Sequence, residues 1–353
     1  MGVGLRLSGI AADALAEPEA LDELRAFLAR EGLYVFTINA FPYGPFHGTR
    51  VKEEVYLPDW MTPERLRFTN LAADILASLL PEGVEGSVST VPGTFKPLAA
   101  APDVSERIAE AMVRHAVHLV GIERRTGRRV ALAVEPEPCC FLETIEETVA
   151  FWRDHLLAAP ARQLLCGLTG LDEREADAAL RRHLGVCYDV CHAAVEFEDP
   201  AGSLAALAEA GIRVTKLQLS SALRLPKVGP DAETLLRPFD EGVYLHQTVE
   251  QRDGEIVRHV DLGPALSALR AGEAGGEWRV HCHVPVFLDR FGPLHSTRDF
   301  LKAVLAICRE RPVSDHLEVE TYTWDVLPAE HKGASKAEAI ARELLWVKEG
   351  LRA

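Results

Sequence analysis

The sequence predicts an α/β fold of the (β/α)8 TIM barrel type, in a single domain that spans residues 1–353. Eight short apolar segments alternate with longer amphipathic segments along the whole chain, which is the order of a barrel built from βα units. Several of the apolar segments also carry small or polar residues at every second position. A doubly wound sheet needs apolar residues on both strand faces, so this alternation favours a barrel with a polar mouth.

Each expected strand is a short run of mainly aliphatic residues. The run VALAVE places three aliphatic side chains on one face and Ala131, Ala133 and Glu135 on the other. The inward face is therefore small along the strand and acidic at its end. The eight expected strands cover residues 3–8, 33–39, 86–90, 130–135, 185–189, 214–219, 278–283 and 316–321.

Segments with helical spacing of apolar residues follow most of these strands. Two connections are longer than a minimal barrel needs, namely the aromatic- and proline-rich loop 40–60 and the excursion 225–262, whose sequence predicts a hairpin. We expect both to cover the mouth, because long loops at that face commonly shape a site. The expected helical segments are 18–32, 62–80, 104–122, 143–159, 203–211, 296–310 and 335–351.

The composition excludes several classes of protein. A formal net charge of −15 argues against a nucleic-acid partner, which requires a basic face. No apolar run approaches the ~18 residues that cross a bilayer, and the first residues lack the clean apolar stretch of a secretory signal. Seven cysteines without a CxxC pair suit a reducing compartment. We therefore expect a cytoplasmic protein.

Acidic residues end three of the expected strands. Glu135 follows inward-facing alanines, Asp189 ends the strand in GVCYDVCHAA, and Glu320 ends the strand in HLEVETYTW. His192 lies three residues after Asp189 and can turn back toward the same mouth. A salt bridge from Glu135 to a loop arginine, or an Asp–His hydrogen bond within a loop, would also explain single members of this set. Together the carboxylates indicate a site for a divalent metal ion.

Two histidines, His281 and His283, share one face of the strand in WRVHCHVPVF. Buried imidazoles need a partner, which can be a metal ion, a substrate or a neighbouring carbonyl group. The cysteines near the strand ends, including Cys187 and Cys191, are interpreted as small packing residues, because they lack the spacing of a structural zinc site.

These motifs resemble a known group of barrels. GVCYDVCHAAVEFED, AVEPEP and EVET resemble strand motifs of the xylose isomerase-like TIM barrel superfamily, which includes sugar isomerases, ketose epimerases and zinc-type abasic-site endonucleases. The finer pattern TINAFPYGPFHG, EPEPCC, KLQLSS and WRVHCHVPVF most resembles the EboE family of metabolite traffic proteins. That family is associated with the export or processing of a secondary-metabolite precursor, together with other proteins of its gene cluster.

The resemblance implies roles for individual residues. Glu135, Asp189 and Glu320 would be metal ligands, and Glu135 and Glu320 would also act as a catalytic acid–base pair. The metal would be Mn²⁺, Mg²⁺ or Zn²⁺. Where the isomerases and epimerases have a histidine ligand on the sixth strand, this chain has Gln218, and His283 could fill that gap. The expected substrate contacts are His192, Asn39, His47, Lys216, His246 and His281.

Three functions follow as hypotheses. The first is a metal-dependent isomerase or epimerase that acts on a small polyhydroxylated, sugar-like metabolite. The second is a component that keeps the metal pocket without turnover and hands a metabolite to a partner enzyme or membrane protein. The third, abasic-site DNA hydrolysis, is disfavoured by the net charge of −15.

Overall fold

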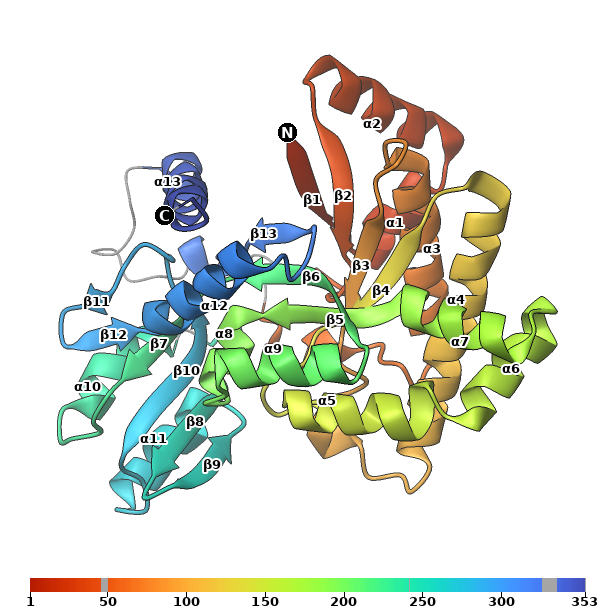
Figure 1. The fold of residues 1–353 in the computed structure, drawn as a ribbon. Helices are drawn as coiled ribbons and strands as arrows, with labels where there is room; N and C mark the ends of the chain where they lie inside the picture. Colours follow the sequence, from red (N-terminus) through yellow and green to blue (C-terminus); the bar gives the residue numbers. More distant parts are fainter. Residues whose placement is uncertain (46–49, 241, 326–334, 353) are drawn as a thin grey trace.

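The computed structural model describes residues 1–45, 50–240, 242–325 and 335–352. Seven parallel strands form a nearly closed barrel sheet (Figure 1). The predicted α/β TIM barrel is therefore confirmed. In spatial order the strands are β1 (Gly2–Arg6), β2 (Tyr34–Asn39), β3 (Gly86–Thr90), β4 (Val130–Val134), β5 (Leu184–Asp189), β6 (Arg213–Leu219) and β13 (Leu317–Val319).

A second, antiparallel sheet lies to the left of the barrel in Figure 1. It packs over its own apolar cluster, which includes Leu223, Leu262 and Trp278. Its strands, in spatial order, are β11 (Arg290–Phe291), β12 (Leu294–Ser296), β7 (Ala222–Leu225), β10 (Glu277–His283), β8 (Thr248–Arg252) and β9 (Glu255–His259).

The expected seventh barrel strand, 278–283, forms as β10 but belongs to this second sheet, so its predicted place in the barrel was wrong. β10 pairs with β7 on one edge and with β8 on the other, both antiparallel. One of these two partners, β8, lies within the excursion 225–262. In the barrel, β13 pairs directly with β6, with Glu318 opposite Gln218.

The predicted hairpin in the excursion is the pair β8 and β9. Asp253 and Gly254 connect the two strands, and both have positive φ angles, 52° and 87°. Asp-Gly with two positive φ values is typical of a two-residue turn that matches the twist of the strands.

Helices surround the outside of the barrel. α3 packs on β2 and β3, α4 and α7 on β4, and α9 on β6. The predicted helix 143–159 is interrupted, because α5 continues into a π-helical turn, Trp152–Leu156.

Of the helices within the described ranges, none is both long and apolar enough to cross a bilayer. The α-helices are α1 (Gly9–Leu15), α2 (Pro18–Arg30), α3 (Pro63–Leu79), α4 (Val104–Thr126), α5 (Ile145–Phe151), α6 (Ala159–Thr169), α7 (Glu173–His183), α8 (Val190–Val195), α9 (Pro200–Glu209), α10 (Ala232–Leu236), α11 (Leu262–Arg270), α12 (Arg298–Glu310) and α13 (Lys336–Gly350); the 3-10 turns are Lys52–Tyr56, Lys96–Leu98, Arg237–Phe239 and Tyr322–Asp325.

The barrel interior is small and polar, as the strand alternation predicts. Inside it, Lys216 on β6 is fully buried and forms an ion pair of 2.5 Å with Glu318 on β13. The Glu318 side chain lies against Gly4 of β1, since a Cβ atom added to Gly4 would lie only 1.8 Å from Glu318 Oε1. A larger residue at position 4 would therefore displace the Glu318 carboxylate.

Candidate metal and substrate site

A pocket of about 520 Å³, partly open to solvent, lies at the carboxyl ends of the barrel strands. One wall comes from residues at or just after strand ends, and the other from the loop 40–60 and the excursion 225–262. Active sites of this fold lie at the same face. The pocket is lined by Arg6, Asn39, Phe41, Pro42, Val51, Lys52, Val55, Tyr56, Glu135, Glu137, His192, Tyr244, Leu245, His281, Glu320 and Tyr322.

Three carboxylates meet beside this pocket and are called the carboxylate centre below: Glu135 after β4, Asp189 at the end of β5 and Glu320 after β13. Glu135 and Glu320 line the pocket, and Asp189 is buried next to them. One oxygen from each lies within 4.8 Å of the other two. Parallel strands bring their carboxyl ends to the same edge of a sheet, which explains why residues so distant in sequence converge. The structure therefore brings together the three predicted acidic ligands.

Asp189 is held rigidly because it also caps the helix α8. Its Oδ1 accepts hydrogen bonds from the backbone N–H groups of Cys191 and His192, at 2.7 and 3.2 Å, and from the Ser220 hydroxyl at 2.6 Å. Burial alone would raise the pKa of Asp189, but His192 and His283 lower it together with these hydrogen bonds. Its second oxygen, Oδ2, faces the centre.

The Gln218 side chain lies among the three carboxylates. Its amide nitrogen is 2.9 Å from Glu135 Oε1, 2.9 Å from Asp189 Oδ2 and 2.6 Å from Glu320 Oε2. Its amide oxygen turns away and accepts a hydrogen bond from the Cys187 thiol, at 3.0 Å.

Negative charge at the centre is incompletely compensated. Burial and the neighbouring charge of Glu320 raise the pKa of Glu135 to about 8. Glu135 Oε2 is buried and has no hydrogen-bond partner within the described residues. A buried carboxylate oxygen without a donor indicates a missing cation or proton. The residues present therefore fit a divalent ion, and their oxygen ligands suit Mg²⁺ or Mn²⁺.

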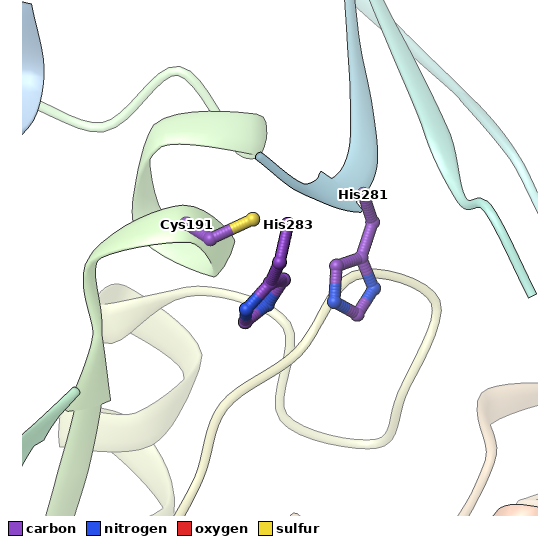
Figure 2. A group of neighbouring side chains, drawn as sticks. All are labelled: Cys191, His281 and His283. Atoms are coloured by element: carbon purple, nitrogen blue, oxygen red, sulfur yellow. The ribbon is translucent and has the colours of Figure 1, made fainter. Parts of the chain in front are cut away.

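Three imidazole rings, of His192, His281 and His283, lie beside this centre. In each ring Nδ1 donates to a fixed oxygen: Pro136 O for His192, Gln247 Oε1 for His281 and Glu320 O for His283, all at 2.8 Å. Figure 2 shows His281 and His283 at the end of β10, with the Cys191 sulfur directed toward His283. Imidazoles anchored through Nδ1 can offer Nε2 to a metal such as Zn²⁺.

The protonation of these rings differs. Burial alone would lower the pKa of His192, but the carboxylates of Asp189 and Glu137 raise it to about 9. Burial and the charge on His192 keep the pKa of His281 well below its usual range. The charged His192 therefore donates from Nε2 to the neutral Nε2 of His281, over 3.1 Å. Burial also raises the pKa of the Cys191 thiol, which makes it a poor metal ligand.

The remaining expected substrate contacts have different positions. Asn39 lines the pocket and donates to Glu320 Oε1 at 3.2 Å. The structure does not place Lys216 in the pocket, because its ammonium group pairs with Glu318 inside the barrel. His246 is buried outside the pocket lining and donates to the backbone oxygen of His281 at 2.9 Å. His47 lies outside the described residues.

Several pocket residues were missed by sequence reasoning. Arg6 ends β1 and forms an ion pair with Glu320 at 3.2 Å. A positively charged residue within an otherwise apolar first strand could have indicated this role. Glu137 accepts hydrogen bonds from the Tyr56 hydroxyl and from Gln247, at 2.7 and 2.9 Å. The sequence shows a proline on either side of Glu137, but it does not predict which way the Glu137 side chain points. Tyr56 carries no local signal, because its loop reaches the site only through the fold.

Comparisons with known proteins support the fold. No family model matches the chain, and a search of curated protein sequences found no match. Among solved structures, the chain is similar to a xylose isomerase domain protein from Planctomyces limnophilus, with 14% identity, coverage of 100% of this chain and 96% of that chain, and a TM-score of 0.52. A xylose isomerase-like TIM barrel protein from Mycobacterium smegmatis in complex with magnesium has 12% identity, coverage of 95% and 78%, and a TM-score of 0.48. The first of these likenesses agrees with the TIM-barrel fold of this chain.

Proposed function

We propose that the protein binds one divalent cation at the carboxylate centre and isomerises or epimerises a small, polyhydroxylated, sugar-like metabolite. The observation that carries this proposal is the convergence of Glu135, Asp189 and Glu320 beside a pocket that two of them line, with Glu135 Oε2 left without a partner among the described residues. Glu135, Asp189 and Glu320 would hold the ion, and Gln218 and His283 are candidates for a further ligand.

The cation, when bound, supplies Lewis-acid stabilisation of negative charge on substrate oxygens. The chain's own residues supply proton transfer. Glu135 and Glu320 both line the pocket, where their carboxylate groups can face a bound substrate. One carboxylate can therefore remove a proton from a carbon next to a carbonyl group while the other returns it.

Neighbouring groups position these carboxylates and the substrate. Arg6 and Asn39 each donate to Glu320 Oε1 at 3.2 Å, which fixes the direction of that carboxylate. His192 and His281 line the same pocket, and either Nε2 atom could bind a substrate hydroxyl group once the hydrogen bond between the two rings opens. Their Nδ1 anchors hold both rings in one orientation, as positioned acid–base and binding groups require.

Solvent exchange tests this function. The protein, loaded with Mn²⁺ or Mg²⁺, is incubated in D₂O with a panel of aldoses and ketohexoses, and deuterium at carbon is measured by mass spectrometry and NMR after removal of the metal. We expect exchange with at least one member, and its loss in Glu135→Gln. Binding of a panel member without exchange would contradict catalysis.

A second function is favoured by one observation. The position that the superfamily resemblance assigns to a histidine ligand is Gln218, whose amide already donates to all three carboxylates. This arrangement suits a protein that binds a metabolite and passes it to a partner protein without turnover. Sugar binding that depends on the cation, together with no deuterium exchange, would support this function over the first.

A further inference from the structure

The Gln218 amide nitrogen stands at the point that the three carboxylates share. It lies within 2.9 Å of one oxygen from each of Glu135, Asp189 and Glu320. A primary amide has two N–H groups, so it cannot donate a separate hydrogen to three acceptors. The nitrogen thus occupies the place of a cation but offsets only part of the negative charge of the three carboxylates.

The backbone prevents Gln218 from withdrawing. β6 is paired on both sides at this residue, with Asp189 on β5 and with Glu318 on β13. The side chain is fully buried. A half-turn of the terminal amide exchanges its nitrogen and oxygen within nearly the same volume and is the motion that this packing leaves open.

The environment of the amide oxygen permits that half-turn. Cys187 Sγ lies 3.0 Å from Gln218 Oε1 and donates its S–H to it. A thiol can also accept a weak hydrogen bond, so the turned NH₂ group would still have a partner.

We propose that the Gln218 amide nitrogen fills the cation's position in the metal-free protein, and that cation binding turns the amide over. The oxygen then faces the cation and the NH₂ group faces Cys187. This inference rests on the proposed cation at the carboxylate centre. It also explains how the metal-free protein keeps three carboxylates together, and it means that a cation must displace the Gln218 amide nitrogen in order to bind.

Thermal unfolding of Gln218→Met tests the displacement. Methionine has a similar volume but neither donates to carboxylates nor offers a hard oxygen ligand. The metal-free variant should unfold at a lower temperature than the metal-free wild type, because the three carboxylates lose the donor that they share. The Mn²⁺-loaded variant also lacks the amide oxygen of the turned side chain as a ligand, so the metal-free comparison is the one that tests the amide nitrogen as a substitute for the cation.

The matched control is Gln247→Met. Gln247 is also a fully buried glutamine beside the pocket, but its amide donates to Tyr56 and Glu137 and not to the carboxylate centre. Its substitution should lower the unfolding temperature by the same amount with and without Mn²⁺. Metal-free Gln218→Met that unfolds at the temperature of the metal-free wild type would overturn the inference, since the amide would then not compensate the carboxylates.

A direct measurement follows the amide itself. The side-chain NH₂ resonances of Gln218, in protein labelled with ¹⁵N-glutamine and assigned by their absence in Gln218→Met, should shift upfield when diamagnetic Mg²⁺ binds, because carboxylate acceptors are exchanged for sulfur. Mg²⁺ binding by calorimetry without such a shift would overturn the inference. Wild type that binds neither Mg²⁺ nor Mn²⁺ would instead overturn the proposed function.

Discussion

Arg6 Nη2 lies 3.2 Å from Glu320 Oε1, and these two residues are 314 positions apart in the sequence. Arg6 ends β1 and Glu320 follows β13, the two strands at the ends of the barrel sheet. The ion pair therefore joins the ends of the sheet at the level of the pocket, and it orients one of the three carboxylates of the candidate metal site.

Arg6→Met tests this connection. The pair is partly exposed, at 27% and 15% for the two side chains, so its loss should lower the free energy of unfolding by only about 1 kcal/mol. Urea denaturation measures this change. Mn²⁺ should bind at least as tightly as in wild type, because Glu320 loses a competing cation. The control is Arg25→Met, which breaks an exposed pair with Asp22 and should change little; a loss of Mn²⁺ binding in Arg6→Met would contradict this account.

Removal of the proposed ligands should remove the metal. We expect Asp189→Asn and Glu320→Gln to lose most bound divalent metal, measured by element analysis of protein purified without chelator, because each removes negative charge from a buried centre. Glu137→Gln is the matched control, since Glu137 lies in the same pocket but outside the carboxylate centre. Full metal content in both ligand variants, or selective loss in Glu137→Gln, would place the ion elsewhere.

The ion pair between buried Lys216 and Glu318, whose side chain is 22% exposed, gives a stability prediction. Lys216→Met should lower the free energy of unfolding by roughly 2 kcal/mol, less than for a fully buried pair, because Glu318 would lose its partner but keep some contact with water. The double variant Lys216→Met/Glu318→Leu should recover much of this loss, since it leaves no unpaired charge. Chemical denaturation of the two variants and wild type provides the comparison. If Lys216→Met has wild-type stability but weaker sugar binding, Lys216 is a substrate contact after all.

Glu198 predicts a pH-dependent stability outside the pocket. Burial and the nearby charge of Glu196 raise the pKa of Glu198 to about 7, although Ile145 N donates to it at 2.7 Å. Between about pH 4.5 and 7 the folded protein keeps a proton that the unfolded chain releases. Stability from this group is therefore present at low pH and falls as the pH rises through this range, by on the order of 3 kcal/mol.

The Glu198→Gln variant removes this dependence. Its free energy of unfolding, measured by urea denaturation from pH 5 to 8, should fall less steeply with rising pH than that of wild type. Glu209→Gln, on the exposed surface of α9, is the control and should follow wild type. Parallel curves for wild type and Glu198→Gln would show that Glu198 keeps an ordinary pKa.

Much of the fold could be predicted because its signals are local. Alternation along VALAVE separates an outward apolar face from an inward small face, and β4 follows that division with every residue buried. All eight expected strands form, within a few residues of their predicted bounds. The sheet to which residues 278–283 belong could not be predicted, because their sequence is compatible with either sheet. They belong to the second sheet because β7 and β8 pair with the two edges of this strand.

The sequence by itself determined that Glu135, Asp189 and Glu320 stand at the ends of parallel strands, since strand period and strand ends are properties of short segments. Only the tertiary structure decided what surrounds them. Arg6 reached Glu320 through closure of the sheet, and Lys216 was drawn to Glu318 inside the barrel. The amide of Gln218 came to lie among all three carboxylates. These contacts join residues far apart in the chain, so no short segment of the sequence predicts them. They matter because a charge removed from water needs a nearby partner.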